Sequence, residues 1–408
     1  MRITIVNACH PDRHHVCAFR GTTFAEILTK AGHQVVLITP PLPGLGEGDD
    51  QTTLAQKFED HDWTKYCHIV GGFKDGSLLP SVRTGKVPAP LRQMIIGYNY
   101  LTRGNIYHDW IGPSSALLPI IASEFKPDIV WAIFGNTSCW VMGQTLADTA
   151  HCPWVADIKD NWQAFLPYGL KKAMAHRFTD AAAFTVLSQA HAETYPSTPG
   201  QEFKSIYNGI SPSLMVTASK TAKEQKIREE ILITGSLYQV DVLAKILQAI
   251  ASWPKASPDQ KIVYAGGDTE IFDRAIQALE IDLNIQKLGN LAPNDLWQRQ
   301  RCAKLNVYVR NPPNLIHHKL LELLAANRPI LAYPGETDES VMIANDLKGE
   351  FFPCTTEAEV HQALEHSFSK NTSATLNFND LQQFSSQHQA DMLATLFTKI
   401  VEQHGTNL

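Results

Sequence analysis

The segment NLIHHKLLELLAANRPILAYP, residues 314–334, decides the fold prediction because it joins a helix with a charged start to a buried strand. Lys319 and Glu322 are three residues apart, so they share one face of a helix near its first turn. Backbone N–H groups at that end are free, and the helix dipole is positive there. Such a site favours an anion such as a phosphate, with a hydroxyl-bearing group beside it. An amphipathic helix with solvated Lys and Glu side chains is the alternative.

This segment resembles the donor-site helix of GT-B glycosyltransferases, especially glycosyltransferase family 4. The matching positions are Lys319, Glu322, Ala325, Arg328, Pro329, Leu331 and Ala332. The resemblance implies that Lys319 binds the diphosphate of a nucleotide-sugar and that Glu322 accepts hydrogen bonds from ribose hydroxyls. Where the family has a glutamate against the transferred sugar, this chain has Asn314. An amide still binds a sugar hydroxyl, but it carries no charge to stabilise a cationic transition state.

Length and composition restrict the class of protein. With 408 residues, of which 44% are hydrophobic, the chain can bury cores in two or three domains. The formal net charge of -6 gives no overall electrostatic reason to bind nucleic acid, so we expect no such partner. The seven cysteines never occur in C-x-x-C spacing, which indicates neither a zinc site nor a disulfide framework. We therefore expect a cytoplasmic protein, and no apolar run is long enough to cross a bilayer.

The first half of the chain alternates β-branched runs with helical patterns. Predicted strands cover residues 2–7, 34–39, 128–133, 154–158 and 183–187. Predicted helices start near residue 22 and cover 114–125, 138–149 and 168–178. Apolar strands separated by helices predict a parallel, doubly wound sheet with both faces covered. Ligands of such sheets bind at the carboxyl ends of the strands.

The pattern breaks at residues 212–230, a polar, lysine-rich passage where we place the connection between domains. It restarts with predicted strands at 231–234, 261–265, 285–288 and 305–309. We therefore expect an α/β protein with two Rossmann-like domains, which the GT-B resemblance implies face each other across a cleft. The resemblance implies that residues 1–212 form the acceptor domain and residues 213–378 the nucleotide-sugar donor domain. The resemblance implies that a terminal helix, 379–408, crosses back onto the first domain.

Further donor-side candidates come from the order of features shared with family 4. Glycines after predicted strands let a nucleotide approach closely because they lack Cβ, although ordinary turns are the alternative. The candidates are Gly235, Gly266, Gly289 and Asn290 in the second domain and Gly21, before the first helix. Family members commonly carry a cation after the first strand of the donor domain, and this chain has none there. Arg310 is the candidate to supply that charge, with a structural arginine as the alternative.

The segment PWVADIKDNW, residues 153–162, ends a predicted strand and resembles a D-x-x-D-x-W segment of related glycosyltransferases. Two carboxylates at a strand end can bind hydroxyls or accept a proton. Asp157 and Asp160 are therefore the predicted catalytic pair that positions the acceptor. Asp160 is the stronger candidate because it lies farther into the loop, and capping of the following helix is its alternative role.

Residues 83–103 combine cations with apolar side chains. No acidic residue occurs between Gly76 and His108. The cations in this stretch are Arg83, Lys86, Arg92 and Arg103. The mixture suits peripheral contact with the inner face of a membrane or with a lipid-diphosphate acceptor. A buried helix with a few exposed cations is the alternative.

The combined expectation is a glycosyltransferase that moves a sugar from a nucleotide-diphosphate sugar to a saccharide or lipid-linked acceptor hydroxyl. The resemblance implies retention at the anomeric carbon and a place in glycan, polysaccharide or glycolipid biosynthesis. The histidine-rich run CHPDRHH, residues 9–15, has no established metal-ligand geometry. The resemblance implies no essential metal and no cofactor, because GT-B enzymes generally need no bound metal for catalysis. The alternatives are a GT-B epimerase or phosphorylase and a catalytically silent nucleotide-sugar-binding subunit. Asn314 and the cation-free GSLYQVD loop motivate the silent subunit.

Overall fold

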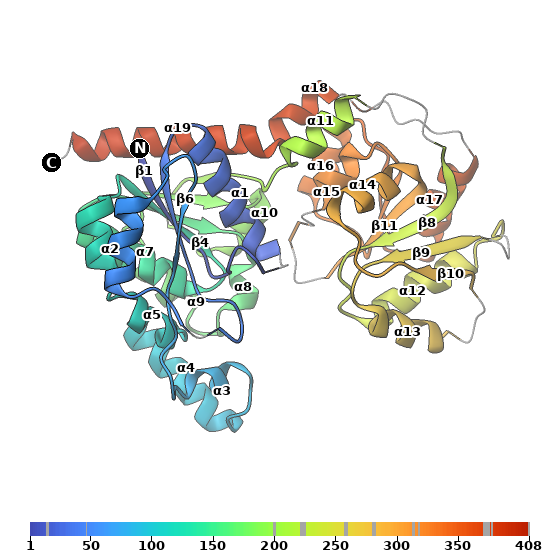
Figure 1. The fold of residues 1–408 in the computed structure, drawn as a ribbon. Helices are drawn as coiled ribbons and strands as arrows, with labels where there is room; N and C mark the ends of the chain where they lie inside the picture. The colour runs from blue at the N-terminus through green and yellow to red at the C-terminus, as the bar shows by residue number, and fades with distance from the viewer. Residues whose placement is uncertain are drawn as a thin grey trace. The chain divides into compact units, whose positions relative to one another are not determined.

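The chain divides into two compact units, each built on one parallel sheet with helices on both faces (Figure 1). Unit 1 comprises Met1–Asn208 and Ser386–Leu408, and unit 2 comprises Gly209–Ser385. The computed structural model describes residues 1–13, 16–45, 47–198, 201–220, 226–256, 260–279, 283–311, 315–316, 319–369, 376 and 378–406. The predicted α/β class with two doubly wound sheets is confirmed.

The strands described in unit 1 form a seven-stranded sheet in the order β3-β2-β1-β4-β5-β6-β7, and all of its pairings are parallel. Their bounds are β1 Arg2–Val6, β2 Gln34–Thr39, β3 Cys67–Val70, β4 Ile129–Phe134, β5 Trp154–Ile158, β6 Ala183–Val186 and β7 Phe203–Ser205. The central strand β4 is buried along its whole length, because helices cover both of its faces. This burial explains its continuous apolar sequence.

The helices of unit 1 cover the two faces of this sheet, except for the two within residues 79–103, which lie away from it (Figure 1). Their bounds are α1 Val16–Lys30, α2 Gln51–Asp60, α3 Leu79–Arg83, α4 Ala89–Arg103, α5 His108–Ser114, α6 Leu118–Ile120, π-helix η1 Ile121–Phe125, α7 Thr137–Ala150, α8 Trp162–Phe165, α9 Lys171–Arg177, α10 Gln189–Thr194 and α19 Ser386–Gly405. Phe24 of α1 and Phe397 of α19 pack with Trp131 on one face, whereas Trp140 of α7 packs with Phe134 on the other.

The strands described in unit 2 form a six-stranded parallel sheet in the order β10-β9-β8-β11-β12-β13. The strand bounds are β8 Arg228–Thr234, β9 Lys261–Ala265, β10 Ile285–Lys287, β11 Ala303–Val309, β12 Ile330–Tyr333 and β13 Phe351–Pro353. The helix bounds are α11 Pro212–Lys220, α12 Val240–Ala251, α13 Thr269–Gln277, α14 Pro293–Cys302, α15 Leu320–Ala325, α16 Asp338–Asp346, α17 Glu357–Ser369, α18 Phe378–Leu381 and 3-10 helix η2 Gln382–Phe384.

The division between the units follows Asn208, a few residues before the predicted boundary at residue 212. Hydrogen bonds explain its position. Arg20 donates to the Ile206 carbonyl and to the Asn208 side chain, and Gln389 of α19 accepts a bond from the Tyr207 N–H, so the chain up to Asn208 belongs to unit 1. The passage 212–230, predicted as the connection, instead contains α11 and the start of β8, with residues 221–225 outside the described residues.

Several predicted helices have different bounds. α1 begins at Val16 rather than near residue 22. The helix predicted over 114–125 is divided, since Ser114 ends α5 and the separate segments α6 and η1 follow. Pro113 and Pro119 lie within this region and lack an N–H group, which favours short segments over one continuous helix. The terminal helix predicted from residue 379 is interrupted, since α18 and η2 precede α19. Strands β3, β7 and β13 were not predicted.

Candidate functional site

The strand order of unit 2 reverses at the pairing of β8 with β11. From β8 the sheet continues to β9, and from β11 it continues to β12 on the opposite side. In open α/β sheets, ligands bind outside the carboxyl ends of the strands at such a reversal. Gly235 directly follows β8 and Arg310 directly follows β11. The two residues therefore lie at the position where ligands of open α/β sheets commonly bind.

Lys319 lies against Gly235. The φ angle of Gly235 is +102°, which L side chains rarely adopt, and a Cβ at this position would lie 3.1 Å from Nζ of Lys319. The absence of a side chain at residue 235 leaves the room that the ammonium group occupies. Lys319 directly precedes α15, and Glu322 lies in its first turn. Because α15 has only six residues, the charge of Lys319 contributes more to the local positive potential than the dipole of this helix does.

The loops after β8 and β9 pack closely together through Tyr264. Its hydroxyl donates a hydrogen bond to the Gly235 carbonyl at 3.1 Å and accepts one from the Asp268 N–H at 3.1 Å. The Asp268 carboxylate accepts a bond from the Leu237 N–H at 2.9 Å. A Cβ at Gly266 would lie 2.6 Å from the Gly235 carbonyl oxygen. The structure thus requires glycine at residue 266 for internal packing of these loops.

Asn290 lies beside the same loops. A Cβ at Gly267 would be 3.2 Å from Nδ2 of Asn290. Gly289 has a φ of +67°, and a Cβ there would meet no atom within 4 Å. Glycine is therefore favoured at residue 289 by the backbone conformation of the turn and not by close packing. The predicted donor-side residues that the structure brings to the carboxyl ends of β8, β9 and β10 are Lys319, Gly235, Gly266 and Asn290.

Lys319 and Glu322 are a partly buried pair of opposite charges. Burial lowers the pKa of the Lys319 ammonium, and the nearby Glu322 carboxylate opposes this shift. Burial likewise raises the pKa of Glu322, and Lys319 opposes that shift. Within the part of the chain that the structure describes, the Glu322 carboxylate accepts no hydrogen bond. Buried charges are normally paired and hydrogen-bonded, so this carboxylate is suited to bind the hydroxyl groups of a ligand.

Arg310 has an internal partner. Its Nε lies 3.6 Å from Oε1 of Glu336, and its backbone N–H donates to the Tyr333 carbonyl. Glu336 is completely buried and also accepts bonds from the Tyr308 hydroxyl at 2.8 Å and the Thr337 N–H at 2.9 Å. The positive charge of Arg310 is therefore balanced within unit 2, which favours the structural alternative for this arginine. Asn314 lies outside the described residues.

Gly21 lies inside α1, so its predicted position in the loop before that helix is wrong. A Cβ at Gly21 would lie 2.9 Å from Nδ2 of Asn7. This amide donates to the carbonyl groups of Cys9 and Cys17 at 3.2 and 3.0 Å. Glycine at residue 21 therefore allows α1 to pack against the residue that follows β1.

Asp157 is the partner of a buried arginine. Its completely buried carboxylate accepts bonds from Nε and Nη2 of Arg20 at 2.9 and 2.6 Å and from the Thr185 hydroxyl at 2.7 Å. With no exposed surface, this carboxylate does not reach an acceptor, and the structure contradicts that predicted role. Asp157 instead fixes α1 to β5 and β6. The sequence does not show this contact, because Arg20 and Asp157 are far apart along the chain.

Asp160 remains accessible beyond the end of β5, with 24% of its side chain exposed. Its Oδ2 accepts a bond from Nζ of Lys159 at 2.7 Å, and the same ammonium group lies 3.2 Å from Sγ of Cys17. Burial alone would lower the pKa of Lys159, but Asp160 and Cys17 outweigh it and the pKa is raised. The side chain of Asn161 caps α8, so helix capping is not the role of Asp160.

His191 is a neighbour of Asp160 that the sequence did not reveal. Burial lowers its pKa to about 4, and the Asp160 carboxylate opposes this shift. Its Nδ1 lies 2.7 Å from the Ser188 hydroxyl oxygen. His191 is therefore a neutral, hydrogen-bonded group behind Asp160 at neutral pH. No sequence pattern distinguishes such a buried histidine from an exposed one.

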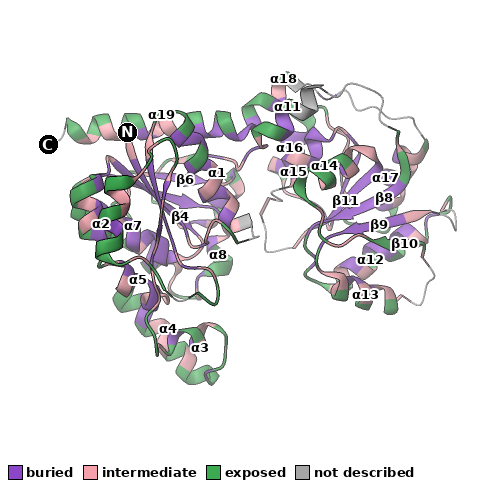
Figure 2. Cartoon of the chain, in the orientation of Figure 1, coloured by how far each residue is buried: buried purple, intermediate pink, exposed green. Residues whose placement is uncertain are grey.

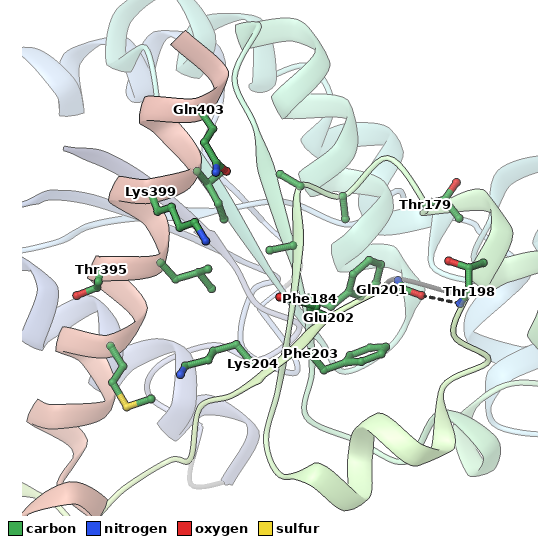
Figure 3. Close-up of a pocket in the computed structure, with 16 residues that line it drawn as sticks. Thr179, Phe184, Thr198, Gln201, Glu202, Phe203, Lys204, Thr395, Lys399 and Gln403 are labelled. Atoms are coloured by element: carbon green, nitrogen blue, oxygen red, sulfur yellow. Dashed lines mark hydrogen bonds between the residues drawn. The ribbon is translucent and has the colours of Figure 1, made fainter. Parts of the chain in front are cut away.

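A surface cavity of about 790 Å³ lies elsewhere in unit 1, between α19 and the β6–β7 edge of the sheet (Figure 3). Its lining includes Phe184, Phe203, Lys204, Leu396 and Lys399. None of the predicted site residues lines it.

Among the described residues, no group of three or more His, Cys, Asp or Glu side chains is arranged to hold a metal ion. His14 and His15 of the histidine-rich run lie outside these residues.

Comparison with known proteins gives structural but no sequence relatives. No family model matches the chain, and no curated protein matches it. A glycosyltransferase from Rickettsia africae ESF-5 superposes with a TM-score of 0.64 at 13% identity, over 98% of each chain. HepE of Anabaena, solved with UDP-glucose, gives a TM-score of 0.60 at 14% identity, over 98% of this chain and all of HepE. UDP-GlcNAc 2-epimerase from Methanocaldococcus jannaschii gives 0.55 at 9% identity.

These similarities define the class of fold. The two parallel-sheet units match GT-B glycosyltransferase structures along nearly the whole chain, so the protein has the GT-B fold. At these identities the similarity establishes the fold alone, because one fold supports many functions.

The Arg20–Asp157 pair makes a testable contribution to stability. Asp157→Leu should lower the free energy of unfolding by about 3–5 kcal/mol, because Arg20 stays buried without its counter-charge. The double variant Arg20→Met/Asp157→Leu should recover most of this loss, since no unpaired charge is left. Urea unfolding followed by circular dichroism gives the measurement.

The exposed pair Lys287–Asp273 in unit 2 provides the control. The variant Lys287→Met/Asp273→Leu should change the free energy of unfolding by less than about 1 kcal/mol. A near-wild-type stability of Asp157→Leu, or a double variant at residues 20 and 157 no more stable than that single variant, would contradict the structural role.

Proposed function

We propose that this protein is a glycosyltransferase that moves a sugar from a nucleotide-diphosphate sugar, held by unit 2, to an acceptor hydroxyl presented by unit 1. The observation that carries the proposal is the placement of Lys319 against Gly235 at the strand-order reversal of unit 2, with Glu322 three residues on. The GT-B fold supports it, because structural neighbours with this fold include glycosyltransferases.

The proposed donor chemistry depends on charge. Departure of a nucleoside diphosphate leaves negative charge on the phosphate oxygens, which the Lys319 ammonium stabilises. Glu322, as a carboxylate, accepts hydrogen bonds from the ribose hydroxyls. The missing side chain at Gly235 lets the phosphates approach the backbone beside Lys319. In the absence of a free Arg310 charge, Lys319 supplies most of the local positive potential.

The acceptor is proposed to bind near Asp160. Its carboxylate is partly exposed and has one oxygen paired with Lys159, so the other oxygen can orient or deprotonate an acceptor hydroxyl. Lys159 is a positioning residue in this account, because its ammonium group holds the carboxylate without facing solvent. We propose a saccharide or lipid-linked acceptor.

Uridine diphosphate sugars are the first donors to test. HepE of Anabaena was solved with UDP-glucose and with UDP and glucose, and an S. aureus MnaA structure contains UDP. We further propose, from the motif resemblance, a family 4-like enzyme that retains the anomeric configuration. We also propose that it acts in polysaccharide or glycolipid biosynthesis in the cytoplasm, without an essential metal or cofactor.

Two alternatives have specific support. An epimerase is favoured by the structural similarity to UDP-GlcNAc 2-epimerases from Methanocaldococcus jannaschii and Listeria monocytogenes, the latter described as putative. A catalytically silent nucleotide-sugar-binding subunit is favoured by Asn314 and by the internal pairing of Arg310. The first predicts an isomerised nucleotide-sugar without acceptor, and the second predicts binding without any turnover.

Product analysis separates these functions. We expect wild-type protein, incubated with nucleotide-sugars and a mixture of acceptors, to release nucleoside diphosphate and form a glycosylated product detectable by mass spectrometry. Asp160→Asn should lose transfer while calorimetry shows unchanged donor binding. Asp180→Asn, on the same unit but in the turn before β6, is the control and should keep transfer. Isomerisation alone, binding alone, or normal transfer by Asp160→Asn would contradict the proposal.

Lys319→Ala should weaken nucleoside-diphosphate binding by about 1–3 kcal/mol, because it removes a charge-assisted contact with phosphate. Isothermal titration calorimetry measures the change. Lys245→Ala, an exposed lysine on α12, is the matched control and should bind as the wild type does. Equal affinities of the wild type and the folded Lys319→Ala variant would exclude Lys319 from the donor site.

Nucleoside-diphosphate affinity should be highest at intermediate pH. As pH falls through the raised pKa of Glu322, its carboxylate is protonated and accepts ribose hydrogen bonds less well. As pH rises through the lowered pKa of Lys319, its ammonium loses its charge. Calorimetry over a pH series should therefore show that Glu322→Gln lacks the acidic decline and Lys319→Arg lacks the alkaline decline. Unchanged profiles in both variants would refute the assignment.

A further inference from the structure

Helix α4 presents a stripe of large apolar side chains to solvent. Leu91, Met94, Tyr98 and Leu101 are 50%, 71%, 60% and 62% exposed. Their spacing of three, four and three residues places them on one face of the helix. Figure 1 shows α3 and α4 away from the sheet of unit 1, and Figure 2 shows exposed residues along both helices. We call these four residues the α4 stripe.

The opposite face of α4 fixes the helix to unit 1. Asn99 and Tyr100 are buried, and Nε of Arg92 donates to the Val82 carbonyl at 2.9 Å. The helix ends at Arg103 and is capped by Gly104, which has a φ of +74° and donates its N–H to the Tyr100 carbonyl. The α4 stripe is therefore an additional apolar face on an anchored helix and does not contribute to the core.

Exposed cations lie near both ends of this helix, and the same segment contains no carboxylate. No Asp or Glu occurs between Gly76 and His108. Asp109 pairs with Arg83, whose Nη1 lies 2.7 Å from the Asp109 carboxylate, so Arg83 is not available to a partner. The remaining cations are Lys86, Arg92 and Arg103, of which Lys86 and Arg103 are exposed.

We propose that the α4 stripe is a docking surface for an anionic lipid membrane, with α4 lying in the plane of the interface. An apolar face buries itself at the boundary of headgroups and acyl chains, and neighbouring cations bind the anionic headgroups. A second copy of this chain fits less well, because a symmetric contact would bring the same cations together. Within the described residues, no helix has the length and apolar character needed to cross a bilayer, so the contact is peripheral.

This inference is independent of the proposed transfer reaction, because it uses neither the donor nor the acceptor residues. It limits the membrane contact that the sequence predicted for residues 83–103 to particular side chains. Arg83 stabilises the fold of unit 1 through Asp109, whereas the α4 stripe and the cations at residues 86 and 103 contact the membrane.

Vesicle flotation with the full chain tests the proposal. The wild type should float with vesicles of phosphatidylcholine and phosphatidylglycerol and much less with phosphatidylcholine alone. Met94→Ser/Leu101→Ser should reduce the bound fraction about tenfold, because it removes apolar area from the interface. Met342→Ser is the matched control, since Met342 is 63% exposed on α16 of unit 2, and it should float as the wild type does.

Lys86→Ala/Arg103→Ala should weaken binding to the anionic vesicles while leaving the α4 stripe intact. Thermal unfolding of each variant should match the wild type, because the substituted side chains are exposed. Three results would overturn the proposal. They are no flotation of the wild type with anionic vesicles, equal flotation of Met94→Ser/Leu101→Ser, and a dimer in sedimentation that this variant dissociates without any vesicle binding by the wild type.

Discussion

The parallel pairing of β8 with β11 is the constraint on which the proposed donor site depends. The sheet continues from β8 to β9 and β10 on one side and from β11 to β12 and β13 on the other. The chain segments that follow β8 and β11 therefore separate at the carboxyl edge of the sheet. Gly235 follows β8 and, without a side chain, leaves room for the Lys319 ammonium. Tyr264 and Asp268 hold the loop at residues 235–237 in place. The proposed donor chemistry therefore depends on backbone positions that the sheet fixes, with Lys319 as the proposed source of positive charge.

The stability of unit 1 depends on a different interaction, the buried Arg20–Asp157 ion pair. Arg20 connects α1 to Asp157 at the end of β5 and to the Ile206 carbonyl beyond β7. Two sequence positions away from Asp157, Lys159 is held by Asp160 and Cys17. This arrangement separates two carboxylates that look equivalent in the sequence. The Asp157 carboxylate is completely buried and bonded to Arg20 and Thr185, whereas the Asp160 side chain is partly exposed and is the one proposed to meet an acceptor.

The sequence predicted the fold class and most strands, because buried parallel strands are continuous apolar runs, which can be recognised locally. Strands β2, β5 and β9 have the predicted bounds. The short edge strands β3, β7 and β13 were missed, since three or four residues carry too little pattern. The proximity of Lys319 and Glu322 was predicted correctly, because helical spacing places them together, whereas their donor-binding role stays a prediction. The roles of Gly21 and Asp157 were not predicted, because they depend on contacts with Asn7 and Arg20 that join different elements.

The most direct test of the central claim is hydrogen–deuterium exchange of the full chain with and without a nucleoside diphosphate such as UDP. We predict slower exchange in the segments around residues 235–237, 266–268 and 319–325 of unit 2, because a diphosphate bound at the proposed site would contact the loop ends and the start of α15. Lys319→Ala should abolish this protection at the same ligand concentration. Protection confined to unit 1 would contradict the proposed donor site. So would the absence of protection at concentrations of UDP or another nucleoside diphosphate that raise the melting temperature.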